Sequence, residues 1–168
     1  SRGGPARSMG SVAGRNRGMG RGVFPDIDSA VAAATQAFQA FTQTSLETRY
    51  RMIDEVRKEC HRHVEQFAKD AFEETGLGRF DQKLIKNRLV IDKTPGPEIL
   101  KTSAQSGDNG LMLEEYAPYG VIGAITPTTN PTETIICNGI GMISAGNAVV
   151  FNPHPGAKKV CALVVQVI

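Results

Sequence analysis

Two polar turns, each at the end of a short apolar run, carry the side chains best suited to chemistry. The first spans residues 125–133 and the second residues 151–159. In the first turn, Asn130 has a side-chain amide that can donate to an oxygen on which negative charge develops. Each turn leads into a predicted helix, whose first N–H groups and positive dipole end attract polar or anionic ligands. The two turns therefore predict a ligand-binding edge.

Asn130 also has a purely structural interpretation. With Asn130 at the N-cap, Pro131 at the first helical position and Glu133 at the third, the segment is ordinary helix-start chemistry and needs no ligand. Helix caps are far commoner than oxyanion donors, so the local sequence favours a cap. Both interpretations stay open at this level.

The other polar candidates are weaker. His154 stands between two prolines with no identifiable partner carboxylate, which is typical of a loop residue rather than of a general base. Residues 60–63, Cys-His-Arg-His, could suggest a metal site. However, consecutive helical side chains point in different directions, and no further ligands follow. We therefore expect no metal site.

Residues 139–144, Gly-Ile-Gly-Met-Ile-Ser, resemble a dinucleotide-binding fingerprint without fitting one. Glycines that hold a phosphate lie in the turn directly after a strand, whereas these fall inside a predicted helix. No Asp or Glu that could bind a ribose hydroxyl follows Glu133. We expect these glycines to permit close packing between helix and sheet.

The elements that must position the two turns form a βαβ unit. The nearly continuous apolar run at residues 119–126 predicts a strand buried on both faces of a parallel sheet. Residues 130–145 predict a helix, residues 147–151 a second buried strand, and Pro155 opens another helix. This order of elements predicts two parallel strands joined by a helical crossover.

Apolar residues at helical spacing predict four helices before this unit. Asp26 or Asp28 caps the first helix. Its expected buried face consists of apolar residues spaced three or four positions apart, namely Ile27, Val31, Ala34, Phe38 and Phe41. A capping box from Thr44 to Glu47 starts the second, and Gly76 ends a third that begins near His63. The prolines of residues 94–97 end the fourth. Its expected buried face consists of Phe80, Leu84, Ile85 and Leu89.

A turn cluster at residues 107–110, Gly-Asp-Asn-Gly, predicts an antiparallel hairpin between the helices and the βαβ unit. We therefore expect an α/β chain in three parts. These are a disordered Arg/Gly-rich leader or linker at 1–22, a helical lobe with the hairpin at 23–117, and the incomplete start of a doubly wound parallel-sheet domain at 118–168.

The composition excludes several classes of protein. The net charge of +2 hides a basic leader, because residues 1–22 contain five Arg and no acid and leave 14 basic and 17 acidic residues elsewhere. A nucleic-acid-binding fold therefore has no support, and no apolar run resembles a membrane span or a secretory signal. Three cysteines without tight pairing indicate a reducing, cytoplasmic compartment. Because the chain starts without Met and stops inside an apolar run, we expect a piece of a longer protein.

The most distinctive pattern lies in residues 116–133 (YAPYGVIGAITPTTNPTE) and 145–155 (AGNAVVFNPHP), with support from residues 74–79 and 83–88. This pattern resembles the aldehyde dehydrogenase superfamily, and closely its CoA-acylating branch, the propionaldehyde and acetaldehyde dehydrogenases of bacterial microcompartments. The resemblance covers about residues 23–168. It implies the helical lobe, oligomerisation hairpin and NAD/CoA-binding domain of that fold.

The resemblance also implies roles for the residues of both turns. Asn130 would donate its amide to the aldehyde oxygen and stabilise the oxyanion of a thiohemiacetal. Many non-acylating relatives have Lys at the position of Asn152 and Glu at that of Pro155, and this chain departs at both. Loss of that carboxylate suits a site shared by NAD and the 3′-phosphorylated adenosine of CoA. The implied cofactor-binding residues are Ile125, Thr126, Pro127 and Thr128 on the nicotinamide side, and Asn152, Pro153, His154, Pro155 and Lys158 at the adenosine end.

The implied chemistry is attack of a Cys thiolate on a short aliphatic aldehyde, hydride transfer to NAD and transfer of the acyl group to CoA. Cys137 and Cys161 fall inside predicted apolar helices and have structural roles, so the nucleophile is expected C-terminal of this segment, which alone should be inactive. The hairpin implies a dimer or tetramer. The expected location is the interior of a microcompartment, with the leader contacting shell or lumen proteins.

Two alternative functions remain open. One is a non-acylating semialdehyde dehydrogenase that releases free acid. The other is an interaction module whose Arg/Gly leader binds RNA or a shell protein. RNA-binding Arg/Gly tracts usually interleave aromatic side chains for base stacking, and residues 1–22 contain none. We therefore expect no nucleic-acid partner.

Overall fold

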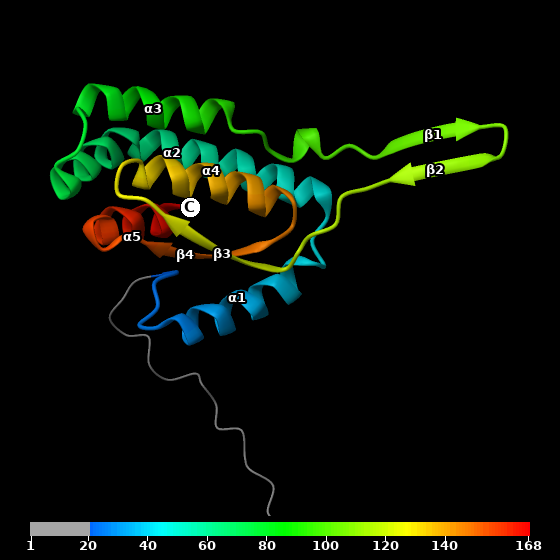
Figure 1. Cartoon of the computed structure of the whole chain (residues 1–168), viewed down its shortest axis with the longest axis horizontal. Coiled ribbons are helices and arrows are strands. Elements are labelled where there is room, and N and C mark those ends of the chain that lie inside the picture. The colour runs from blue at the N-terminus through cyan, green and yellow to red at the C-terminus, as the bar shows by residue number, and fades with distance from the viewer. Residues whose placement is uncertain (1–20) are drawn as a thin grey trace, which may run out of the picture.

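The structure is a computed structural model that describes residues 21–168. The predicted disordered leader therefore lies almost entirely outside the described residues. Three layers make up the body (Figure 1): α1 covers one side of a two-stranded parallel sheet, α4 covers the other, and α2, α3 and α5 pack around α4.

The first helix has its predicted range and cap but not its predicted buried face, because Ile27 and Val31 are exposed. The second and third predicted helices merge. Helix α1 spans Ile27–Phe41, and the Asp26 side chain caps it by accepting from the N–H of Ser29 at 2.8 Å. Helix α2 runs without a break over Leu46–Thr75, so the separate start near His63 was wrong. Its N-cap is Ser45 rather than Thr44, and Gly76 ends it with a left-handed φ of 65°. The continuous polar and apolar periodicity across residues 56–63 supports one helix equally well.

Helix α3, Phe80–Lys93, exposes the face that was expected to be buried. Phe80, Ile85 and Leu89 are exposed, and the buried positions are Lys83, Asn87 and Ile91. This inward face is mostly polar because it lies over the backbone of the 125–133 turn, where Lys83 finds a carbonyl acceptor. A 3-10 turn, η1, follows at Pro97–Ile99.

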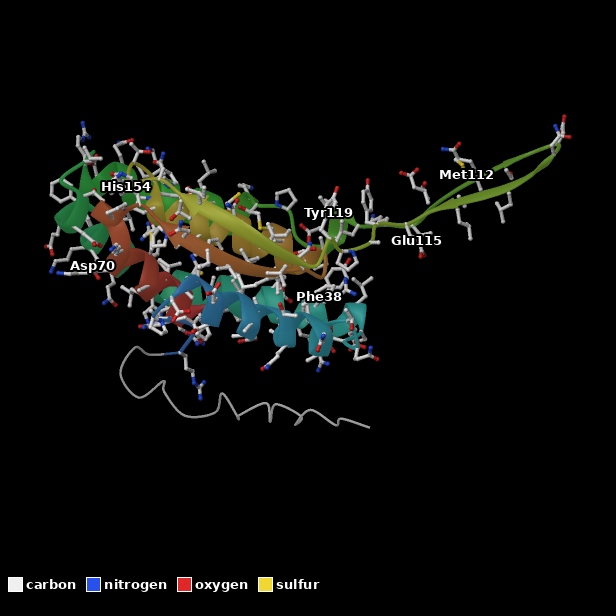
Figure 2. The ribbon with its side chains drawn as sticks, turned by 60° about the horizontal axis from the view of Figure 1, so that its bottom comes forward. Phe38, Asp70, Met112, Glu115, Tyr119 and His154 are labelled. Atoms are coloured by element: carbon white, nitrogen blue, oxygen red, sulfur yellow. The ribbon has the colours of Figure 1, made fainter. Side chains whose placement is uncertain are left out.

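The hairpin forms as predicted and projects from the body. Strands β1, Ser103–Gly107, and β2, Gly110–Glu114, pair antiparallel with Gly107 opposite Gly110. Every residue of both strands is exposed. Figure 2 shows the arm extending away from the body with Met112 near its outer part.

The predicted βαβ unit is confirmed. Strand β3, Val121–Thr126, is followed by helix α4, Pro131–Ser144, and strand β4, Ala148–Pro153. The two strands pair parallel over their full length, from Val121 opposite Ala148 to Thr126 opposite Pro153. After a short 3-10 turn, η2 at Pro155–Ala157, helix α5 spans Lys158–Val167.

Only one face of β3 is buried, contrary to the prediction. Ala124 and Thr126 point into the core, whereas Ile125 on the opposite face is 82% exposed. Helix α1 covers the start of the strand, where a Cβ atom on Gly120 would lie 3.8 Å from the Phe38 ring, and leaves the exposed Ile125 at its end uncovered. The apolar run therefore produced a strand that is covered on both sides only in part.

The main core lies between α2, α4 and α5. Its fully buried side chains include Phe67 of α2, Ile135 and Ile140 of α4, and Val160 and Val164 of α5. A Cβ atom on Gly139 would lie 3.2 Å from Cδ1 of Ile168, so this glycine permits close approach of the C-terminal residue to α4 rather than packing against the sheet.

Candidate functional site

The two predicted turns lie at the same edge of the sheet. Thr126 and Pro153 are paired at the ends of β3 and β4, and the N–H of His154 donates to the carbonyl oxygen of Thr126 at 3.0 Å. This hydrogen bond extends the parallel pairing one residue beyond the end of β4. The chain segments at residues 125–133 and 151–159 therefore begin side by side.

Asn130 is the N-cap residue of α4 and caps the helix only through its backbone. Its carbonyl oxygen accepts from the N–H of Thr134 at 3.1 Å and from the Thr134 hydroxyl at 2.7 Å. Its side chain makes no capping hydrogen bond, so the predicted side-chain cap is absent. Instead, Oδ1 of Asn130 accepts from Nζ of Lys86 at 3.1 Å. Within residues 21–168 the side-chain NH₂ of Asn130 donates to no protein group.

The other residues predicted in the first turn divide between surface and core. Ile125 and Pro127 are exposed and Thr128 is half-buried. Thr126 is 1% exposed, and its Oγ1 lies 3.7 Å from Sγ of Cys161. The Thr126 side chain therefore belongs to the core, and only its backbone can border a ligand at this edge.

The residues predicted in the second turn lie on the surface. Asn152, His154, Pro155 and Lys158 are exposed, and Pro153 is half-buried. His154 caps the 3-10 turn, because its Nδ1 accepts from the N–H of Gly156 at 3.1 Å. With Nδ1 used in this way and no ion pair to a carboxylate among residues 21–168, His154 has the local role of a loop residue.

The start of α5 is occupied by a carboxylate from another helix. Glu74, near the end of α2, accepts from the N–H of Lys159 at 2.9 Å and from the N–H of Val160 at 2.7 Å. An anionic ligand cannot use these two N–H groups while Glu74 holds them. The expectation that α5 presents an open N-terminus is therefore wrong at its first turn. No sequence pattern assigned this role to Glu74, which lies 85 and 86 residues from its partners.

Two lysines of α3 reach the Asn130 turn and were also missed. Nζ of Lys83, whose residue is only 3% exposed, donates to the carbonyl oxygen of Thr129 at 3.2 Å, and Lys86 binds Asn130 as described above. Their spacing of three residues places both side chains on one side of the helix. The same spacing occurs on any polar helix face, so the sequence held no signal for these contacts.

The cysteines of the chain do not supply a nucleophile to this edge. Burial raises the pKa of Cys60 to about 12, and burial also raises the pKa of Cys161. A thiol with a raised pKa is protonated at neutral pH and reacts poorly. Cys137 is exposed and lies in the middle of α4, away from the start of the helix.

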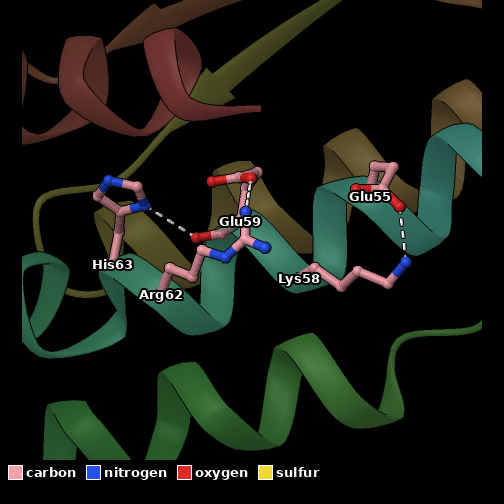
Figure 3. Close-up of polar contacts among 5 residues, drawn as sticks. All are labelled: Glu55, Lys58, Glu59, Arg62 and His63. Carbon is pink, nitrogen blue, oxygen red and sulfur yellow. Dashed lines mark hydrogen bonds and ion pairs between the residues drawn. The ribbon is translucent and has the colours of Figure 1, made fainter.

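The histidines near Cys60 make contacts typical of a helix surface. Figure 3 shows His63, whose Nδ1 lies 2.9 Å from the carbonyl oxygen of Glu59, beside the Glu59–Arg62 and Glu55–Lys58 ion pairs of α2. His61 pairs with Asp92 of α3 at 2.7 Å. Among residues 21–168, no group of three or more His, Cys, Asp or Glu could hold a metal ion, and no helix is long and apolar enough to cross a membrane.

Comparison with known proteins identifies close relatives of the chain. The model of the aldehyde dehydrogenase family matches residues 21–168. The chain is 47% identical over 149 residues to a propanal dehydrogenase (CoA-propanoylating) of Citrobacter freundii, an alignment that covers 89% of this chain and 32% of the relative.

Two solved structures are similar to the chain. The first is a propionaldehyde dehydrogenase of Rhodopseudomonas palustris with bound CoA and an acylated cysteine, 54% identical, with a TM-score of 0.84 over 87% of this chain and 34% of the other. The second is a propionaldehyde dehydrogenase from the fucose utilisation bacterial microcompartment of Clostridium phytofermentans, 51% identical, with the same TM-score and coverage. The chain thus spans about a third of the length of the relatives it matches.

The contact of Glu74 with α5 leads to a prediction about local stability. Replacing Glu74 by Ala in the full-length protein removes the acceptor of two N–H groups, which should destabilise the start of α5 by about 1 kcal/mol. Amide hydrogen exchange at residues 159 and 160 should become roughly fivefold faster, which corresponds to that free energy. Glu73→Ala is the matched control, since Glu73 is exposed and lies 3.9 Å from Lys69. Equal exchange in both variants would show that Glu74 does not cap α5.

Proposed function

Because the chain belongs to the aldehyde dehydrogenase family, we propose that the protein containing it oxidises a short aliphatic aldehyde, propionaldehyde or acetaldehyde, to the acyl-CoA with NAD. The observation that carries the proposal is the side-chain NH₂ group of Asn130, which donates to no group of residues 21–168 and lies at the edge where β3 and β4 end side by side. The CoA-acylating names of the relatives support the substrate class. The comparisons do not favour the non-acylating or RNA-binding alternatives.

Asn130 is the residue of this chain that would contact the aldehyde. Its side-chain NH₂ would donate to the carbonyl oxygen, on which negative charge develops when a thiolate attacks the carbon. The residue is half-buried, and the donor is held before the reaction starts. A fixed donor needs no reorganisation at the transition state, which makes its hydrogen bond effective there.

The exposed residues of the two turns fit an extended cofactor lying across both strand ends. Bound NAD would supply the hydride acceptor and CoA the acceptor thiol. Ile125, Pro127 and Thr128 would border the nicotinamide side, with Thr126 contributing its backbone only. At the adenosine end, the exposed Asn152, Pro155 and Lys158 would provide the contacts. Since Glu74 holds two N–H groups of α5, contacts with phosphate would come from the Lys158 side chain.

The nucleophilic cysteine of the proposed reaction would come from polypeptide outside this chain. Cys60 and Cys161 are buried thiols with raised pKa values, and Cys137 lies in the middle of α4 away from the strand ends. The chain by itself would therefore bind part of the cofactor but form no thioester.

The hairpin would join this protein to a second copy of itself. Leu111, Leu113 and Tyr116 are all more than 60% exposed on an arm that has no contact with the body beyond its base. Exposed apolar side chains on unpaired strand edges favour association. We place the resulting dimer or tetramer inside a bacterial microcompartment, as for the similar enzyme of Clostridium phytofermentans, with residues 1–22 as the segment that contacts shell or lumen proteins.

The reaction itself is tested with purified full-length protein. Incubation with propionaldehyde, NAD and CoA should give propionyl-CoA and NADH in equal amounts, because hydride transfer and acyl transfer are steps of one cycle. Reduction of NAD should depend on CoA after the first turnover. Formation of free propionate at the same rate without CoA would overturn the acylating assignment in favour of a semialdehyde-type dehydrogenase.

The role of Asn130 is tested by Asn130→Ala. Loss of an oxyanion donor should lower kcat by roughly 10²–10³-fold, because the hydrogen bond is strongest in the transition state. Thr129→Ala is the matched control, since the Thr129 contact seen here uses its backbone carbonyl and survives the change. If Asn130 served the helix alone, stability would fall by about 1 kcal/mol and kcat would be unchanged.

The hairpin is tested by placing charge on its apolar face. Leu111→Asp combined with Leu113→Asp should shift the protein to a smaller assembly in sedimentation velocity, because two carboxylates would have to be desolvated in the interface. Gln36→Glu, which adds a charge to the exposed face of α1, should leave the assembly unchanged. An assembly of unaltered size in the double variant would exclude the hairpin as the interface.

A further inference from the structure

We propose that Lys86 is a positioning residue for Asn130 that fixes which end of the amide faces the substrate. This inference rests on the proposed function, since it assigns Lys86 a part in the same oxyanion contact. The contact that carries it joins Nζ of Lys86 in α3 to Oδ1 of Asn130 at 3.1 Å, across 44 residues of sequence.

The chemistry of the two groups determines the orientation. A side-chain amide has an acceptor end and a donor end of nearly equal size, and rotation of the amide by 180° exchanges them. A lysine ammonium group has three donors and no acceptor. It can therefore bind only the oxygen of Asn130, and this contact turns the NH₂ group away from α3. Without Lys86, both orientations of the amide would be accessible, and one of them would present an oxygen to the negatively charged intermediate.

The positive charge of Lys86 also strengthens the donor. A cation at the oxygen end of an amide withdraws electron density from its N–H bonds, and linked hydrogen bonds polarise one another in this way. The NH₂ group of Asn130 becomes a better donor to an oxygen on which charge accumulates. Lys86 thus acts through Asn130, and no direct contact of Lys86 with the substrate is required.

Lys83 holds the backbone beneath the same side chain. Its Nζ donates to the carbonyl oxygen of Thr129, the residue just before Asn130, and the residue is 3% exposed. The carbonyl oxygen of Lys83 accepts from Nδ2 of the fully buried Asn87 one turn later. Two lysines of α3 therefore contact consecutive residues of the turn, one through the backbone and one through the side chain. The buried Lys83 and the exposed Lys86 thus place two cations of α3 beside the start of α4.

Lys86 is the better residue to change, because its contact lies at the surface and its loss leaves no buried charge unpaired. In the full-length enzyme, Lys86→Met should lower kcat about tenfold and leave KM for the aldehyde nearly unchanged, a smaller effect than loss of the donor itself. Lys86→Arg, which retains a cationic donor, should recover most of the loss. Lys93→Met, an exposed lysine in the last turn of α3, is the control and should keep the wild-type kcat.

A double-mutant cycle separates positioning from a general structural role. In the Asn130→Ala background, Lys86→Met should cause no further loss, because the group that Lys86 orients is gone. The inference would be overturned if Lys86→Met lowered kcat by the same factor in the wild-type and the Asn130→Ala backgrounds, or if it left kcat of the otherwise wild-type enzyme unchanged. Electron density hardly distinguishes the two ends of a side-chain amide, so neutron crystal structures of the full-length wild type and Lys86→Met provide the readout besides activity. The Asn130 oxygen should face residue 86 in the wild type, and the amide should adopt both orientations in Lys86→Met. The same single orientation in both structures would also overturn the inference. Absence of propionyl-CoA formation by the wild type would instead reject the proposed function, and the two crystal structures would still decide the orientation of Asn130.

Discussion

The parallel pairing of β3 and β4 is the constraint on which the candidate site depends. Its register places Thr126 opposite Pro153, and the bond from His154 to Thr126 extends it by one residue. Because the strands are parallel, the chain must leave both of them at the same edge of the sheet. Residues separated by more than twenty positions thereby become neighbours before any side chain of the turns makes a contact. A slip of the register would move the two turns apart along the strands and separate Asn130 from the second turn.

Side chains from α2 and α3 then hold the two turns that the strand pairing places side by side. Glu74 of α2 holds the start of α5, and Lys83 and Lys86 of α3 hold the start of α4. At the opposite edge, Oδ1 of the buried Asn147 accepts from the N–H groups of Tyr119 and Gly120 and ties the two strand starts together. Each contact joins a side chain to a chain segment that regular secondary structure leaves without partners. The helical lobe is therefore part of the site, because it supplies the groups that hold the turns.

The sequence predicted the elements of the fold well and the contacts between them poorly. Periodicity and turn residues act within a few positions, so α1, the hairpin and the βαβ unit were accessible from local pattern. Asn130 could be named as a candidate, but local pattern assigned its side chain to a cap that the structure does not contain. The contacts of Glu74 and Lys86 span 85 and 44 residues, and an exposed Glu or Lys on a helix has no distinguishing local signal. The prediction of which face of α3 is buried was wrong for a related reason. The carbonyl acceptor beneath the helix belongs to Thr129, which lies far along the chain.

Helix α4 has no side-chain cap, and the Asn130 oxygen that could have formed one binds Lys86 instead. A capping amide oxygen would bind an N–H of the first turn, and loss of such a cap costs about 1 kcal/mol. Helix α4 can tolerate this loss, because Pro131 presets its first turn and needs no acceptor, and because Ile135, Ile136 and Ile140 are fully buried in the core. Packing rather than capping therefore sets the stability of the helix. With its oxygen bound to Lys86 instead, Asn130 has a side-chain NH₂ group that donates to no group of residues 21–168. The burial and packing of α4 therefore allow the Asn130 oxygen to bind Lys86 instead of capping the helix.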